Sequence, residues 1–183
     1  MQTGDTHIKA LVEGCIGNDR KAQELLYRNY YKVMMNICLR YTSNDSDALA
    51  VLNTAFYKVF KYISRYDASK GGIYTWIRAI VVNECISAAN SSKKRIPAAG
   101  LNEADDIRIE PSVFDKIKEA NLLLLIQQLA PATKTVFNLF VLEGYTHKQI
   151  GEMLSISEGT SKWHLNDARK KLQELIIKQD KTN

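Results

Sequence analysis

The sequence Gly144-Tyr-Thr-His-Lys-Gln-Ile-Gly-Glu-Met-Leu-Ser-Ile-Ser-Glu-Gly-Thr-Ser-Lys-Trp-His-Leu-Asn-Asp-Ala-Arg-Lys-Lys-Leu172 decides the fold of the C-terminal part of this chain. Thr146 stands where it can cap a first helix, and Ser157 stands where it can cap a second. Gly151 has no side chain where these helices would approach most closely, and Ile156 in the turn can fill the space between them. Together these features predict a helix-turn-helix.

The second helix of this motif has an apolar face formed by Leu165, Ala168 and Leu172. The corresponding helix of a DNA-binding helix-turn-helix lies in the major groove and contacts base edges and phosphates. The candidate contacts to bases are Thr160, Lys162, Trp163, His164 and Asn166, and the candidate contacts to phosphates are Arg169 and Lys170. An ordinary helical hairpin with a solvated basic face is the alternative. The agreement between the two caps, the glycine and the turn favours DNA binding.

Composition narrows the class of protein. A chain of 183 residues with 45% apolar content can bury one substantial core or two small ones. Because no apolar run approaches the roughly 20 residues of a membrane span and no signal peptide is visible, we expect a cytoplasmic protein. Cys15, Cys38 and Cys85 are widely separated and predict reduced thiols rather than a metal site. No phosphate-binding glycine loop or nucleophile elbow is visible, so we expect no enzyme and no cofactor.

The net charge of +5 is unevenly distributed along the chain. Residues 1–95 hold 14 basic and 8 acidic side chains, residues 96–115 hold 1 and 5, and residues 116–183 hold 10 and 7. Two basic blocks joined by an acidic segment suggest two domains that both approach a polyanion. The segment 96–115 contains Pro97, Gly100 and Pro111 and predicts a flexible linker. A long loop within a single domain is the alternative.

Three helices are predicted within residues 1–95 from apolar spacings of three and four. The first has on one stripe Ala22, Leu25, Leu26, Val33, Ile37 and Tyr41. The second, capped by Asp45 or Ser46, carries Leu49, Leu52, Phe56, Val59, Phe60 and Ile63. The third has an inward face formed by Trp76, Ile77, Ile80, Val81, Cys85 and Ala88. No alternating strand pattern appears in the sequence, so the predicted fold class is all-α.

The polar segment between the second and third of these helices has the chemistry of a single-stranded nucleic-acid site. Aromatic rings and cations alternate there, at Tyr62, Arg65, Tyr66, Lys70 and Tyr74, and Asn83 adds an amide. Stacking on an unpaired base contributes about 1–3 kcal/mol. The alternative is that these rings belong to the core, and Trp76 in particular is expected to pack there.

The order of these pieces resembles the extracytoplasmic-function group of bacterial RNA polymerase sigma factors. The resemblance covers nearly the whole chain. It is carried by Leu26-Tyr-Arg-Asn-Tyr30, Asp47-Ala48, Asn53-Thr-Ala-Phe-Tyr-Lys-Val-Phe60, Tyr74-Thr-Trp-Ile-Arg-Ala-Ile-Val-Val-Asn83, Leu129-Ala-Pro131, Val136-Phe137 and the helix-turn-helix. Each segment is a moderate signal, and their order and spacing make them a strong one.

The resemblance implies a non-catalytic protein that works with core RNA polymerase and promoter DNA, and that an anti-sigma protein commonly regulates. Domain 1–95 would bind the polymerase clamp through Asn53, Tyr57 and Lys61. The same domain would open the minus-ten element with Arg65, Tyr66, Lys70, Tyr74, Arg78 and Asn83. Domain 116–183 would read the minus-thirty-five element with the second helix of its helix-turn-helix. Leu122–Leu129 and Val136–Leu142 would orient that helix.

Departures from the family pattern give one further prediction. His164 and Asp167 stand where arginine is frequent in the family. Fewer cations on this helix predict a weaker phosphate contribution and a shallower salt dependence. Two other classes stay open: a conventional regulator that binds an operator without polymerase, and a helical adaptor that binds only proteins. Alanine at Lys162 and Trp163 would leave the function of an adaptor intact.

Overall fold

The computed structural model describes residues 2–91 and 119–180. Over these two ranges the chain is helical and contains no strand, which confirms the all-α prediction. The chain divides into two compact units, residues 1–39 with 44–85 and residues 40–43 with 86–183. The predicted linker 96–115 lies outside the described residues. Within the described ranges, no helix combines the length and the apolar character that crossing a membrane requires.

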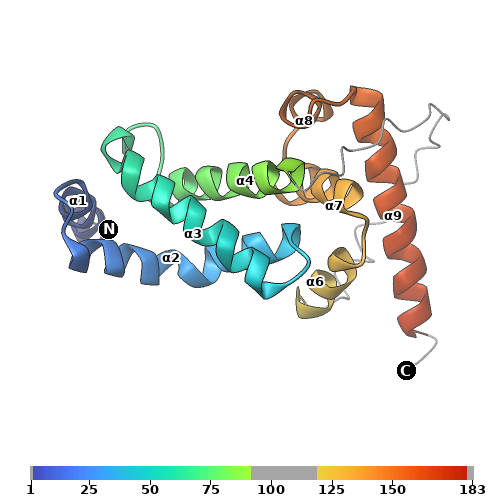
Figure 1. The fold of residues 1–183 in the computed structure, drawn as a ribbon, viewed down its shortest axis with the longest axis horizontal. Helices are drawn as coiled ribbons and strands as arrows, with labels where there is room; N and C mark the ends of the chain where they lie inside the picture. The colour runs from blue at the N-terminus through green and yellow to red at the C-terminus, as the bar shows by residue number, and fades with distance from the viewer. Residues whose placement is uncertain (1, 92–118, 181–183) are drawn as a thin grey trace. The chain divides into compact units, whose positions relative to one another are not determined.

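The N-terminal unit is built from four α-helices and one short 3₁₀ helix. These are α1 (Gln2–Ile16), α2 (Arg20–Tyr41), α3 (Asp45–Tyr62), η1 (Ile63–Arg65) and α4 (Ile73–Ser91), of which α2 and α4 end beyond the unit (Figure 1). Their shared core includes Leu26, Met34, Ile37, Leu52, Phe56, Val59, Ile77 and Val81. Cys15, Cys38 and Cys85 are buried free thiols, as predicted. Both α1 and α3 contact η1, and these contacts hold η1 in place.

Two details of this unit differ from the sequence prediction. The cap of α3 is Asn44, whose Oδ1 accepts a hydrogen bond from the Asp47 backbone nitrogen at 2.8 Å, so the prediction of Asp45 or Ser46 was wrong. The helix starts at Asp45, and a cap precedes the first helical residue. Leu25, Val33 and Leu49 were assigned to buried stripes but are 41%, 45% and 39% exposed. Periodicity located these helices correctly and overestimated the width of their buried faces.

The C-terminal unit surrounds one long helix. Its elements are α6 (Glu119–Gln127), α7 (Pro131–Phe137), the π-helical turn η2 (Asn138–Leu142), α8 (His147–Leu154) and α9 (Glu158–Asp180). α9 contacts α6, α7 and α8 (Figure 1). Buried side chains from all of these elements form the core: Leu125, Ile126, Val136, Phe137, Leu139, Ile150, Leu154, Leu165, Ala168 and Leu172. The predicted scaffold thus packs against α9, although Leu124 and Val141 within it are exposed.

The helix-turn-helix is formed by α8 and α9, as predicted. Thr146 caps α8 through a capping box, in which Thr146 Oγ1 accepts from the Gln149 backbone nitrogen and Gln149 Oε1 accepts from the Thr146 backbone nitrogen. Ser157 caps α9, since its Oγ accepts a hydrogen bond from the Thr160 backbone nitrogen at 2.9 Å. Both helix starts are therefore fixed by side chains that the sequence identified.

Candidate nucleic-acid interface

One face of α9 is accessible and carries most of the predicted DNA contacts. Lys162, Asn166, Arg169 and Lys170 follow spacings of four, three and one, which align them along one side of the helix. Lys162 and Lys170 are exposed, whereas Asn166 and Arg169 are half-buried. Trp163 is also half-buried, and its ring lies 4.9 Å from the His164 ring in an edge-on arrangement. This face can offer cations and an amide to a groove.

An acidic residue stands at the start of this face, in the half of the helix that the sequence predicted to meet base edges and phosphates. Glu158 begins α9, and its Oε1 lies 2.9 Å from Lys162 Nζ. The hydrogen bond and the positive charge of Lys162 hold the pKa of the Glu158 carboxyl below its ordinary value. The spacing of four between Glu158 and Lys162 is that of a helical ion pair. Glu158 and Lys162 together present an acceptor beside a donor at the N-terminus of the helix.

Two of the predicted base contacts, Thr160 and His164, are buried. Thr160 is 8% exposed and His164 is 4% exposed, so neither side chain lies on the accessible face of α9. Their spacing of four from each other and from Ala168 places them on the side that packs inside the unit. Thr160 Oγ1 is hydrogen-bonded to Ser157 Oγ at 2.8 Å, and His164 faces Thr133 of α7. A polar residue near the start of a recognition helix cannot be assigned to DNA from sequence alone.

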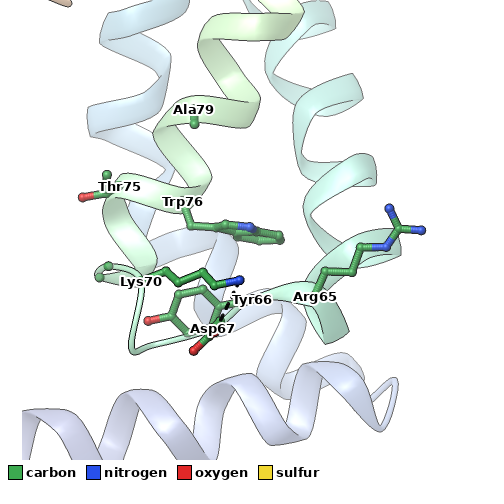
Figure 2. A pocket seen from close by; sticks show the side chains of 9 residues that line it. Arg65, Tyr66, Asp67, Lys70, Thr75, Trp76 and Ala79 are labelled. Atoms are coloured by element: carbon green, nitrogen blue, oxygen red, sulfur yellow. Dashed lines mark ion pairs between the residues drawn. The ribbon is translucent and has the colours of Figure 1, made fainter.

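A pocket lies in the N-terminal unit between the segment after η1 and the first turns of α4. It has a volume of about 310 Å³ and is lined by Arg65, Tyr66, Asp67, Lys70, Gly71, Gly72, Thr75, Trp76 and Ala79. Figure 2 shows the Trp76 and Tyr66 side chains close together at the pocket, with Lys70 beside them, and the two ring centroids are 5.8 Å apart with planes inclined by 57°. Packing was favoured over base stacking for Trp76, and its half-buried ring forms a wall of the pocket.

The predicted strand-opening residues divide between this pocket and its surroundings. Arg65, Tyr66 and Lys70 line the pocket, although the Arg65 side chain points away from the two rings in Figure 2 and its guanidinium lies 4.8 Å from the Tyr62 ring centroid. Tyr74 lies outside, 43% exposed, with its ring 6.5 Å from that of Tyr30. The other two residues, Arg78 and Asn83, are further along α4 and do not line the pocket.

Asp67, which lies within the segment Arg65–Gly72 that the resemblance assigns to strand opening, gives the pocket a negative charge. Its Oδ1 accepts hydrogen bonds from the Ser69 hydroxyl at 2.7 Å and the Ser69 backbone nitrogen at 2.9 Å, and its Oδ2 lies 3.7 Å from Lys70 Nζ. The Ser69 hydroxyl, followed by the Ser69 backbone nitrogen, holds the Asp67 pKa below its ordinary value. The carboxylate therefore stays ionised, where it can accept from a base amino group and repels a phosphate.

The residues predicted to bind polymerase lie together on α3. Asn53, Tyr57 and Lys61 are all exposed and are separated by four residues, so they form one stripe. Asn53 Oδ1 accepts a hydrogen bond from the Tyr27 hydroxyl at 3.2 Å, and Lys61 Nζ is 5.9 Å from the Tyr57 ring centroid. Exposed Leu49 precedes Asn53 by four and extends the stripe. The sequence prediction assigned Leu49 to the core. Its spacing of four from Asn53 could have indicated that Leu49 belongs to this exposed stripe.

Metal-ion chemistry has no visible site in the described parts of the chain. Across residues 2–91 and 119–180, no cluster of three or more histidine, cysteine, aspartate or glutamate side chains is arranged to hold an ion.

Comparison with known families identifies both units. The family described as Sigma-70 region 2 matches residues 26–95, and the family described as Sigma-70, region 4 matches residues 119–172. The ECF RNA polymerase sigma-E factor of Haemophilus influenzae is 25% identical over 180 residues, which cover 92% of this chain and 94% of that protein. The RNA polymerase sigma-H factor of Pseudomonas aeruginosa is 23% identical over 186 residues, covering 91% and 92%. ECF RNA polymerase sigma factor SigM of Mycobacterium tuberculosis is 24% identical over 173 residues, covering 91% and 83%.

Both matched regions come from one class of transcription factor and occur in the order found in that class. The chain belongs to the sigma-70 family, as an extracytoplasmic-function RNA polymerase sigma factor. It is an alternative sigma factor that directs transcription initiation, and sigma factors are not enzymes. The resemblance noted in the sequence is thereby confirmed.

Proposed function

We propose that this sigma factor binds core RNA polymerase in the cytoplasm and selects promoters through two separate DNA readouts. Domain 1–95 opens the minus-ten element, domain 116–183 reads the minus-thirty-five duplex, and residues 96–115 connect them. Binding by one domain then raises the effective concentration of the other at the same promoter. The observation that carries the proposal is the aromatic pocket beside Arg65–Gly72. A protein that reads only duplex DNA would not need a pocket that can take an unpaired base.

The minus-thirty-five readout is assigned to the accessible face of α9. Lys162 and Glu158 contact base edges, since lysine donates to guanine and glutamate accepts from cytosine. Asn166 extends this contact along the groove. Arg169 and Lys170 bind phosphates and set the register of the helix on the duplex. Thr160 and His164 are excluded from this set because both are buried.

The minus-ten readout is assigned to the pocket and the exposed residues near it. An unpaired base can enter the pocket and stack against one of its aromatic rings, Trp76 or Tyr66, and such stacking contributes about 1–3 kcal/mol. Asp67 accepts from the base, and Arg65 and Lys70 attract the backbone. Tyr74 provides a second stacking surface outside the pocket. The remaining two residues, Arg78 and Asn83, contact the displaced strand where it runs along α4.

Binding of core polymerase is assigned to the stripe on α3 that is formed by Leu49, Asn53, Tyr57 and Lys61. Tyr57 is 64% exposed, and aromatic side chains that are exposed in one chain often anchor a protein interface. We infer that an anti-sigma protein would compete for the same stripe. The hydrogen bond from Tyr27 fixes the amide of Asn53, so this surface is organised before a partner binds.

In vitro transcription tests the proposal directly. Core RNA polymerase is incubated with a library of genomic fragments, with and without the sigma factor, and the transcript starts are mapped. New discrete starts are expected with the wild-type protein and with Lys178→Ala, a control near the far end of α9. The double variant Lys162→Ala with Asn166→Ala is expected to lose them. Operator binding by the protein alone, with no new starts, would instead support a conventional regulator.

A further inference from the structure

A chain of hydrogen bonds joins α7 to the recognition helix inside the C-terminal unit. Thr133 Oγ1 donates to Asp167 Oδ2 at 2.9 Å and lies 3.1 Å from His164 Nδ1. His164 and Asp167 are separated by three residues on α9, so a single hydroxyl of α7 is held at two points almost one turn apart. Two attachment points restrain both the position of α9 and its rotation about its own axis.

The hydrogen bonds determine which nitrogen of His164 carries the proton. A threonine hydroxyl has one hydrogen, and Thr133 gives it to Asp167. Thr133 Oγ1 can therefore only accept from His164, which requires a hydrogen on Nδ1. A neutral imidazole has one N–H, so Nε2 carries none. His164 Nε2 is buried and has no hydrogen-bond partner in the described part of the chain.

Protonation of this ring would place a second N–H in a site that has no acceptor for it. The charged groups near His164 on its own helix are Asp167 and Lys171, and Lys171 Nζ lies 3.2 Å from the same Asp167 oxygen. The facing helix α7 contains one charged residue, Lys134, which is not among the groups that shift this histidine. Burial lowers the pKa of His164, Asp167 opposes that effect, and Lys171 adds to it.

We propose that His164 is a positioning residue for promoter recognition, whose neutral Nδ1–H ring fixes α9 on α7 and whose protonation releases it. The accessible face of α9 belongs to the same rigid helix, so any rotation of α9 displaces Lys162 and Asn166 from the groove. The bond network stands on geometry alone, and only its effect on DNA rests on the proposed function. The same network explains why His164 and Asp167 occur together where cations were expected.

Nitrogen NMR of the full chain, labelled on histidine, tests the network without DNA. At pH 7.5, His164 is expected to show a protonated Nδ1 and an unprotonated Nε2. On acidification its ring is expected to take up a proton only as the signals of the C-terminal unit change. A hydrogen on Nε2 at pH 7.5 would overturn the proposal, and so would protonation of His164 with no change in α7 or α9.

A pair of variants tests the positioning role in the holoenzyme. In His164→Asn the amide nitrogen stands at the same number of bonds from Cβ as Nδ1, so the bond to Thr133 is kept and nothing titrates. In His164→Gln the nitrogen stands further out. At pH 7.5, we expect promoter affinity within about threefold of wild type for the first variant and about tenfold or more weaker for the second. Equal affinity for the two variants would contradict the proposal.

The pH dependence supplies a readout that a packing role would not change. Between pH 7.5 and 5.5, the unfolding equilibrium of the wild-type C-terminal unit should shift toward unfolding more steeply than that of His164→Asn, by up to about tenfold per pH unit. Equal slopes would overturn the proposal. If both variants fail to fold, Thr133→Val keeps the side-chain shape, and unchanged promoter affinity in that variant would be equally contradictory. If wild-type holoenzyme finds no promoter, the proposed function fails while the NMR result still decides the network.

Discussion

A methyl group added to Gly151 would lie 2.8 Å from the main-chain oxygen of Ile156, closer than real Cβ atoms approach such an oxygen. Gly151 belongs to α8 and Ile156 to the turn before α9, so their contact sets how tightly the helix-turn-helix closes. The sequence predicted a close approach at Gly151, and the structure shows that the main chain of the turn makes the contact.

Gly151→Ala should therefore destabilise the C-terminal unit by about 1–3 kcal/mol, because the main chain of the turn has to move. The greater helix propensity of alanine offsets only part of that cost. Denaturant unfolding of the full chain measures the change. Gly17→Ala is the control, since its added methyl would meet neighbours at an ordinary 3.5 Å. Unchanged stability of Gly151→Ala would mean that the turn is more adaptable than its geometry indicates.

Replacement of Lys170 should weaken promoter binding by a similar factor on every sequence. Lys170 is exposed on the face of α9 that we assign to DNA. Loss of one phosphate contact reduces the slope of log affinity against log salt by about 1. Holoenzyme binding of Lys170→Gln, measured at several salt concentrations, gives this slope. Lys178→Gln, on the same helix and outside the assigned face, should keep the wild-type slope, and an unchanged slope in both variants would remove Lys170 from the interface.

Removal of the Tyr74 ring should slow promoter opening about tenfold, since stacking on an unpaired base contributes about 1–3 kcal/mol. Tyr74 is 43% exposed and lies at the start of α4, beside the aromatic pocket. Permanganate reactivity of unpaired thymines measures opening in Tyr74→Ala and in Tyr74→Phe, which keeps the ring. A template already unpaired over the minus-ten element should restore activity to Tyr74→Ala. Failure of that template to restore it would indicate a role in binding rather than opening.

Acid should weaken the contact between α8 and α9 through His147. His147 Nδ1 lies 2.9 Å from Ser161 Oγ, and its ring stacks on Phe140 with centroids 4.4 Å apart. Burial lowers the His147 pKa, Lys162 and Arg169 lower it further, and Glu158 raises it. In the unfolded chain histidine titrates near about 6.5.

The sign of the effect follows from that order. Above about pH 6.5 both states are neutral at His147 and it contributes no pH dependence. As pH falls through that value, the unfolded chain binds the proton first, and stability declines until the folded ring is protonated too. Lys162→Gln should raise the His147 pKa, which ring proton NMR would detect. The pH range over which stability declines should therefore become narrower. An unchanged pKa would show that the charge of Lys162 does not act on His147, and a lowered pKa would contradict the prediction.

Local sequence patterns were enough to locate the helices and to identify the class of protein. The caps Thr146 and Ser157, the close approach at Gly151 and the apolar spacing of α9 depend on residues near each other in the chain, and the structure confirmed them. The pocket was only half predicted. The segment that holds its cations, Tyr66 and Asp67 was identified, but Trp76 was assigned to packing, because only the fold places the first turns of α4 against that segment.

The sequence by itself determined an all-α chain with a helix-turn-helix and the family to which it belongs, because helical periodicity, caps and motif order are properties of neighbouring residues. Tertiary structure alone decided how wide the buried face of each helix is and which polar side chains it includes. Leu49 became exposed, whereas Thr160 and His164 became buried. The reason is physical: a polar side chain near the start of α9 can bond either to DNA or to Thr133 of α7, and only the packing of α7 on α9 selects between them.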